Sequence, residues 1–126
     1  MRSSAETRVI HWVDSHRSNE LFISAVNRAE IERGLNLLPK GKRQKAKSAA
    51  ADGLFSAFSG RCLAFDETAA IEFGRISAFC TRSGRPISVE DAQIASIALV
   101  HRLKLATRNT KDFELIEGLV IINPWA

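Results

Sequence analysis

The strongest constraint on the fold of this chain is the alternation of short apolar runs with longer stretches of helical periodicity. The runs are too brief for core helices and predict strands at residues 21–26, 61–65, 104–107 and 119–122. The stretches between them predict helices over residues 27–38, 48–58, 67–81 and 88–100, with a short helix before the last strand. In the third of these, Asp66 is the predicted cap, and the apolar side comprises Ala70, Ile71, Phe73, Ile76 and Phe79. Strands that alternate with helices form a mainly parallel sheet covered on both faces, so the predicted class is α/β.

Length and composition favour a single globular domain over residues 1–126, which would bury about two-thirds of the surface of its unfolded chain. Cys62 and Cys80 are too few for a disulfide framework or a four-ligand zinc site, so we expect reduced, mostly buried thiols in a cytoplasmic protein. No apolar run approaches the ~18 residues of a membrane helix, and no signal peptide is recognisable. The net charge of +4 permits a polyanionic partner but also suits ordinary solubility.

Histidines and serines offer little support for other kinds of catalytic site. Residues 6–17 predict a short amphipathic helix, whose His11 and His16 lack further His or Cys residues at ligand spacing. We therefore expect these two histidines at the surface or at a helix end. Neither Ser24 nor Ser88 has a histidine partner at a suggestive position, which argues against a Ser-His hydrolase.

Three acidic residues follow helix-capping residues at the same spacing. The patterns are Asn27-x-x-Glu30, Ser88-x-x-Asp91 and Asn109-x-x-Asp112. One interpretation is that each acid only stabilises the start of a helix, by about 0.3 to 1 kcal/mol. The other is that three helix starts at one sheet edge bring their carboxylates together around Mg²⁺, which prefers oxygen ligands. Spacing alone leaves both interpretations open.

A basic segment lies between the first two long helices. Residues 40–47, KGKRQKAK, carry five positive charges in eight positions. The segment is either a solvated turn and helix start or a patch that contacts phosphates. No aromatic residues are interleaved with the charges, so stacking on bases is not indicated.

From Thr7 to Trp125 the sequence resembles the PIN-domain toxins of bacterial toxin-antitoxin pairs, the VapC and FitB-like group. The matching segments occur in the same order and at the same spacing as in that group. They are Trp12 with Asp14, SAVNRAEIERG at 24–34, Leu38-Pro39 with Gly41, LAFDETAA at 63–70, GRPISVEDAQIASIA at 84–98, LATRNTKDF at 105–113, and Asn123-Pro124-Trp125.

The resemblance implies a three-layer α/β/α fold and a Mg²⁺- or Mn²⁺-dependent endoribonuclease, which forms a homodimer and is held inactive by a cognate antitoxin. Glu30 and Asp91 match two of the family's acidic positions. Asn109 occupies the fourth, with Asp112 as a possible substitute. The implied catalytic and metal-binding residues are therefore Glu30, Asp91 and Asp112, with Thr107 and Asn109 in support. RNA would be contacted through Arg108, Lys42 and Arg43.

The start of the chain departs from the family pattern. The family opens with an apolar strand that ends in D-T-N, and its aspartate is a principal metal ligand. Here no Asp precedes Asp14, and residues 1–9 leave no room for that strand. In the family's strand order, 3-2-1-4-5, the missing strand is central. Since neighbouring strands lie about 4.8 Å apart, its former neighbours would be roughly 10 Å apart, beyond hydrogen bonding.

Three explanations of this departure remain open. The natural start lies upstream of Met1, the sheet closes up or takes a strand from another chain, or the toxin has decayed. We favour the first. The alternative function is accordingly a catalytically impaired PIN-like module that binds antitoxin or RNA without turnover.

Overall fold

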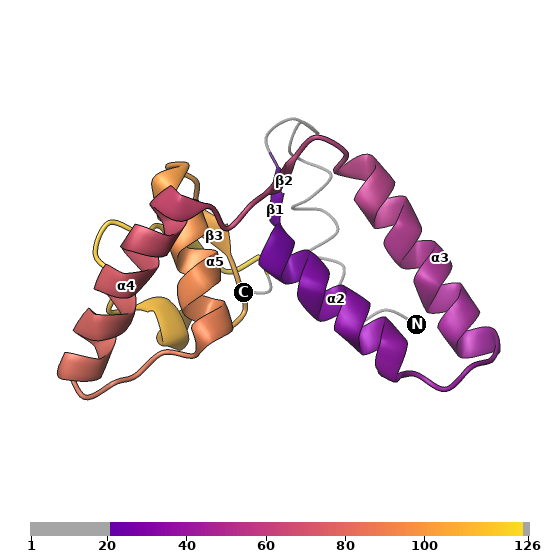
Figure 1. Ribbon diagram of the computed structural model, residues 1–126, viewed down its shortest axis with the longest axis horizontal. Coiled ribbons are helices and arrows are strands. Elements are labelled where there is room, and N and C mark those ends of the chain that lie inside the picture. The colour runs from indigo at the N-terminus through magenta and orange to yellow at the C-terminus, as the bar shows by residue number, and fades with distance from the viewer. Residues whose placement is uncertain (1–20, 125–126) are drawn as a thin grey trace. The chain divides into compact units, whose positions relative to one another are not determined.

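The computed structural model describes residues 21–124, which form two compact units, residues 21–64 and 65–124 (Figure 1). The helix predicted over residues 6–17, with both of its histidines, lies outside the described residues, and so does Trp125. The single domain over residues 1–126 stays a prediction. No helix in the described ranges is long and apolar enough to cross a membrane.

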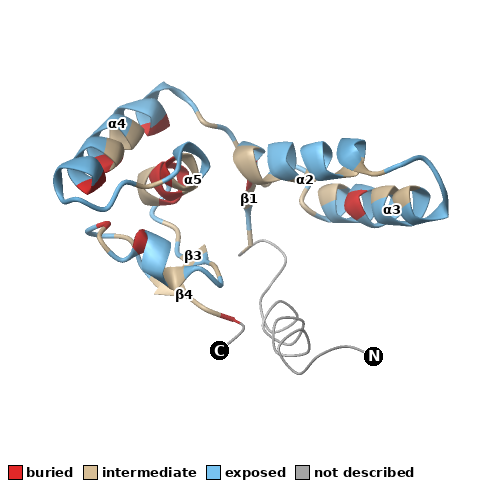
Figure 2. Ribbon diagram, turned by 90° about the horizontal axis from the view of Figure 1, so that it is seen from below, coloured by how far each residue is buried: buried red, intermediate tan, exposed pale blue. Residues whose placement is uncertain are grey.

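The first unit is a helical hairpin between two short parallel strands. Its elements are β1 (Ile23–Ser24), α2 (Ala25–Leu37), α3 (Lys42–Ala57) and β2 (Cys62–Leu63). Ile23 pairs with Cys62, and Ser24 with Leu63. Figure 2 shows that most of both helices is exposed, with a buried position on α3 at Ala51. The guanidinium of Arg28 lies 4.0 Å from the centre of the Phe55 ring, so a cation–π contact joins α2 to α3.

The start of α2 differs from the prediction, which placed a strand up to Val26 and a cap at Asn27. The helix begins at Ala25, because Ser24 and Asn27 together form a capping box. The Ser24 hydroxyl accepts from the Asn27 N–H at 3.1 Å, while the Asn27 side-chain oxygen accepts from the Ser24 N–H at 3.0 Å. Asn27 is thus the inner member of the cap, and Glu30 lies beyond the first turn.

The start of α3 also differs from the prediction, which began the helix at Ser48. The helix begins at Lys42, so most of the basic segment is helical. Lys, Arg, Gln and Ala are all good helix formers, which explains the earlier start. Gly41 provides no side-chain cap, and no acidic residue lies in the first turn. Positive charges there oppose the helix dipole, so this end is electrostatically unfavourable in isolation.

The second unit contains α4 (Glu67–Arg82), α5 (Val89–Val100), β3 (Leu105–Ala106), the 3₁₀ helix η2 (Thr110–Phe113) and β4 (Ile121–Ile122). The predicted caps are confirmed: Asp66 accepts from the Ala69 N–H at 2.9 Å, and Ser88 from the Asp91 N–H at 3.2 Å. The buried core joins α4 and α5 to the segment around η2. It comprises Ile76, Cys80, Ala92, Ala95, Phe113 and Ile116.

Three predictions about burial are wrong. Cys62 is exposed, although Cys80 is buried as expected, and both are free thiols. Ile71 and Phe79 were assigned to the apolar side of α4, but they are 71% and 44% exposed. The packed side of α4 centres instead on Ile76 and Cys80.

Strand pairing in the described residues is entirely parallel, as predicted. There are two separate two-stranded sheets, β1 with β2 and β3 with β4. In β3–β4, Leu105 pairs with Ile121, and Ala106 with Ile122. In the family's numbering, β1 with β2 corresponds to strands 2 and 3, and β3 with β4 to strands 4 and 5. These are the neighbouring pairs of the order 3-2-1-4-5 that do not involve strand 1.

Candidate active site

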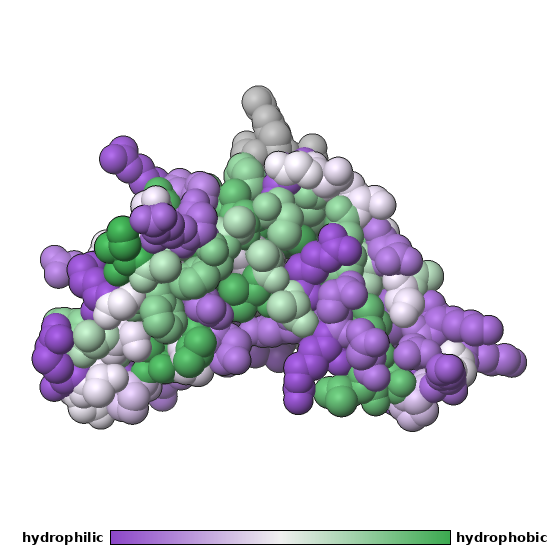
Figure 3. Space-filling model, viewed as in Figure 1, coloured by the Kyte–Doolittle hydropathy of each residue, from purple (hydrophilic) through white to green (hydrophobic). Residues whose placement is uncertain are grey.

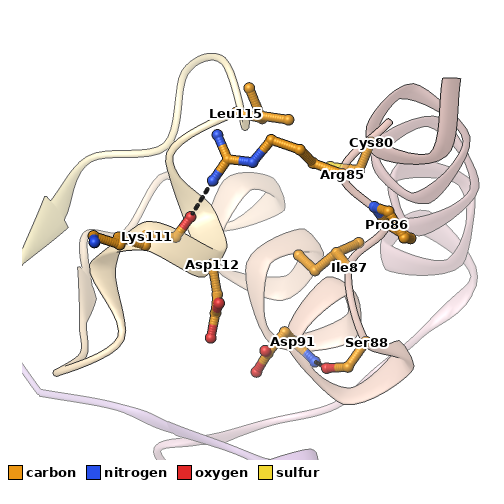
Figure 4. A pocket seen from close by; sticks show the side chains of 9 residues that line it. All are labelled: Cys80, Arg85, Pro86, Ile87, Ser88, Asp91, Lys111, Asp112 and Leu115. Atoms are coloured by element: carbon orange, nitrogen blue, oxygen red, sulfur yellow. Dashed lines mark hydrogen bonds between the residues drawn. The ribbon is translucent and has the colours of Figure 1, made fainter. Parts of the chain in front are cut away.

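A cavity of about 260 Å³ opens in the second unit beside the start of α5 and the η2 turn (Figure 4). Its lining combines two carboxylates with two cationic side chains and an apolar floor. The lining residues are Cys80, Arg85, Pro86, Ile87, Ser88, Asp91, Lys111, Asp112 and Leu115. The structure therefore brings together Asp91 and Asp112, two of the three predicted site acids.

Asp91 is placed by the cap of α5. Its backbone N–H donates to the Ser88 hydroxyl, so the cap uses the main chain of Asp91 and leaves the carboxylate for the pocket. Asp91 is partly buried, whereas Glu90 before it is exposed and Ala92 after it is buried. The interpretation of Asp91 as a capping acid is thus compatible with a second role in the pocket.

Asp112 reaches the same cavity from η2. Its N–H donates to the Asn109 carbonyl at 3.2 Å, and the next residue, Phe113, is buried and anchors the turn. The predicted side-chain cap by Asn109 is absent, since η2 has no side-chain capping bond. Instead, the Thr107 hydroxyl accepts from the Asn109 N–H at 3.1 Å. Thr107 therefore shapes the turn that leads to Asp112.

Figure 4 shows both carboxylates at the same end of the pocket, while the Lys111 side chain extends away from them. Two ion pairs occur within residues 21–124, Arg75 with Glu72 and Arg85 with Glu114. Neither involves Asp91 or Asp112. Carboxylate oxygens are ligands that Mg²⁺ prefers, so these two side chains could hold such an ion.

Glu30 belongs to the other unit and is exposed on α2. No group of three or more His, Cys, Asp or Glu side chains suited to a metal ion occurs in the described part of the chain. The pocket itself supplies two carboxylates. The role of Glu30 as a third ligand stays a prediction.

The predicted RNA-contacting residues are all exposed. Lys42 and Arg43 lie in the first turn of α3, and Arg108 follows β3 in the other unit. Hydrophilic side chains gather over the turn between α2 and α3 and the start of α3 in the space-filling view (Figure 3). This basic surface, with Lys42 and Arg43, belongs to the first unit, whereas the pocket belongs to the second.

Sequence reasoning missed Arg85, Lys111 and Glu114. Arg85 and Lys111 line the cavity, and Glu114 forms an ion pair with Arg85 at 2.8 Å. Arg85 lies in the segment GRPISVEDAQIASIA, but nothing in its local pattern indicates a distant partner.

The chain belongs to the PIN-domain family, whose profile matches residues 2–119. Its relatives include VapC and FitB proteins. VapC ribonuclease Y4jK of Sinorhizobium fredii is 35% identical over 98% of this chain and 89% of the relative. Toxin FitB of Neisseria gonorrhoeae is 32% identical over 99% and 90%, respectively.

A solved structure agrees with this assignment. The crystal structure of FitAcB from Neisseria gonorrhoeae matches with a TM-score of 0.88 at 32% identity, covering 94% of this chain and 86% of that one. The predicted α/β PIN-like fold is thereby confirmed. The predicted membership in the VapC and FitB-like group is confirmed by the relatives.

Proposed function

We propose that this chain is a Mg²⁺-dependent endoribonuclease toxin of a toxin-antitoxin pair. The observation that carries the proposal is the meeting of Asp91, from α5, and Asp112, from η2, in one open pocket. The name of the relative from Sinorhizobium fredii, a VapC ribonuclease, supports RNA as the substrate. The toxin relative FitB supports an antitoxin as the partner.

The residues in the pocket fit a hard divalent cation. Mg²⁺ usually keeps several waters and is bound in proteins through one or two carboxylates together with substrate phosphates. Asp91 and Asp112 supply two such carboxylates, and ~260 Å³ is room for an ion with some of its waters. When bound, Mg²⁺ or Mn²⁺ would polarise the scissile phosphate and activate a water for in-line attack.

The protein side chains have distinct tasks in this proposal. Asp91 and Asp112 hold the ion, and Thr107 with Asn109 supports the turn that carries Asp112. Positively charged side chains hold the RNA through its phosphates, which gives affinity without reading sequence. These are Lys42, Arg43 and Arg108.

We place the active protein in the cytoplasm as a homodimer. Exposed apolar side chains on α4, Ile71 and Phe79, are available for a face between two copies. Phe73 packs against the core of its own unit and forms an edge-to-face contact with Phe65, so it serves the interior.

A second function is favoured by one observation, the presence of Asn109 at a position where the family carries an acid. In this alternative the chain binds antitoxin or RNA without turnover. Incubating RNA with the purified chain, in Mg²⁺ and in excess chelator, separates the two. Cleavage only in Mg²⁺ is expected. Absence of cleavage by a folded chain that still binds its antitoxin would contradict the nuclease and support the module.

The basic start of α3 gives a prediction for RNA binding. In the double variant Lys42→Gln/Arg43→Gln, the plot of log affinity against log salt concentration should become less steep, its slope changing by about 1.4. Each lost phosphate contact on a single strand accounts for about 0.7 of this change. Fluorescence anisotropy at several salt concentrations measures this slope. Arg82→Gln/Arg102→Gln removes the same charge from exposed positions of the other unit and should leave the slope unchanged. If both double variants keep the parental slope, Lys42 and Arg43 do not contact the RNA phosphates.

A further inference from the structure

Arg85 joins the connection between α4 and α5 to the η2 turn. Its Nη2 atom donates to the Lys111 carbonyl at 3.1 Å and lies 2.8 Å from the Glu114 carboxylate. Lys111 directly precedes Asp112 in the chain, and Glu114 follows two residues later. One guanidinium therefore holds the turn on both sides of Asp112, while its own element leads into the helix that carries Asp91 (Figure 4).

The backbone of Arg85 is held in place by hydrogen bonds at the end of α4. The end of α4 forms a Schellman motif, in which Gly84 has a φ of +78°. The Arg85 N–H donates to the Cys80 carbonyl at 3.0 Å, and the Gly84 N–H to the Thr81 carbonyl at 3.1 Å. Cys80 is a core residue, and Pro86 restricts the chain after Arg85.

The η2 turn, in contrast, is weakly held by its own hydrogen bonds. It has four residues, and its bonds from Asp112 to Asn109 and from Glu114 to Lys111 are 3.2 and 3.5 Å long. Bonds of this length are at or beyond the usual range. Phe113 anchors the turn in the core, but Asp112 is exposed. The orientation of Asp112 thus depends on contacts from outside the turn.

The charge of Arg85 is directed away from the site acids. Figure 4 shows its guanidinium toward the end of the pocket opposite the Asp91 and Asp112 carboxylates. Glu114 balances that charge. An arginine paired with the site acids would compete with a cation, whereas this one leaves both carboxylates available.

We propose that Arg85 is a positioning residue that holds η2 so that the Asp112 carboxylate lies at the same end of the pocket as that of Asp91. Its consequence for metal binding rests on the proposed function. Groups that orient metal ligands typically change metal affinity by about 10- to 100-fold when they are removed. Exposed ion pairs contribute little to global stability, so the effect of Arg85 should be local.

The test compares Arg85→Gln with Arg75→Gln, which removes another arginine–carboxylate pair of the same unit. Amide hydrogen exchange without metal should be faster at residues 109–116 in Arg85→Gln alone. Calorimetric titration with Mn²⁺ should show about tenfold weaker binding in that variant and parental binding in Arg75→Gln. Glu114→Gln keeps the bond from Arg85 to Lys111 and should show a smaller change of the same kind.

Two results would overturn the proposal. Parental hydrogen exchange at residues 109–116 in Arg85→Gln would show that Arg85 does not hold the turn. Faster exchange with parental Mn²⁺ affinity would show that the turn's position does not govern the site. A parent chain that binds no Mn²⁺ contradicts the proposed function instead, and the exchange measurement still decides the role of Arg85. If Arg85→Gln does not fold, Glu114→Gln carries the same comparison.

Discussion

Asp91→Asn is expected to lower the rate of Mg²⁺-dependent RNA cleavage by about 100-fold or more, the scale on which a single charge-stabilising group acts in catalysis. The substitution keeps the shape of the side chain and removes the charge that would hold the ion. The cap of α5 is retained, because Ser88 accepts from the backbone N–H of residue 91. Initial rates with labelled RNA, together with circular dichroism, measure activity and folding separately.

The matched control for this prediction is Glu90→Gln. Glu90 lies in the same first turn of α5, is exposed and does not line the pocket. Both variants lose one negative charge near the same helix start, so they share any effect on the helix dipole. Glu90→Gln should cleave RNA at the parental rate. Equal activity of Asp91→Asn and the parent would remove Asp91 from the site.

The largest expected effect on stability comes from Ile76→Ala. Ile76 is 2% exposed in the core shared by α4, α5 and the η2 segment. Truncating a buried Ile to Ala removes apolar contacts and leaves a cavity, at a cost of about 2–5 kcal/mol. Urea unfolding at a fixed protein concentration measures the loss. Val89→Ala, in the same unit but 57% exposed, should change stability by less than about 0.5 kcal/mol. Equal losses would contradict the described packing of α4.

Local signals predicted much of the second unit. Asp66 and Ser88 cap α4 and α5 as expected, because a capping residue acts on N–H groups only a few positions away. Spacing left open whether Asp91 and Asp112 meet, and the resemblance to the PIN-domain toxins implied a shared site; the two residues line the same pocket. In the first unit, Ser24 and Asn27 are both good caps at the right spacing, and the sequence did not show which would begin the helix.

Contacts between distant parts of the chain were beyond sequence reasoning. Arg85 and Glu114 belong to different elements, and their pairing depends on how the core packs η2 beside the end of α4. The exposure of Phe79 likewise depends on which side of α4 meets α5. Helical periodicity indicates that a face is apolar, but it does not choose between a core and a surface that binds a partner.

The central claim is that Asp91 and Asp112 form one metal site, and Mn²⁺ titration of Asp112→Asn by calorimetry tests it most directly. The parent should bind Mn²⁺, whereas Asp112→Asn and Asp91→Asn should each bind it more than about tenfold more weakly, and Glu90→Gln should match the parent. Parental Mn²⁺ affinity in Asp112→Asn would contradict the claim, because the second carboxylate of the pocket would then have no part in holding the ion.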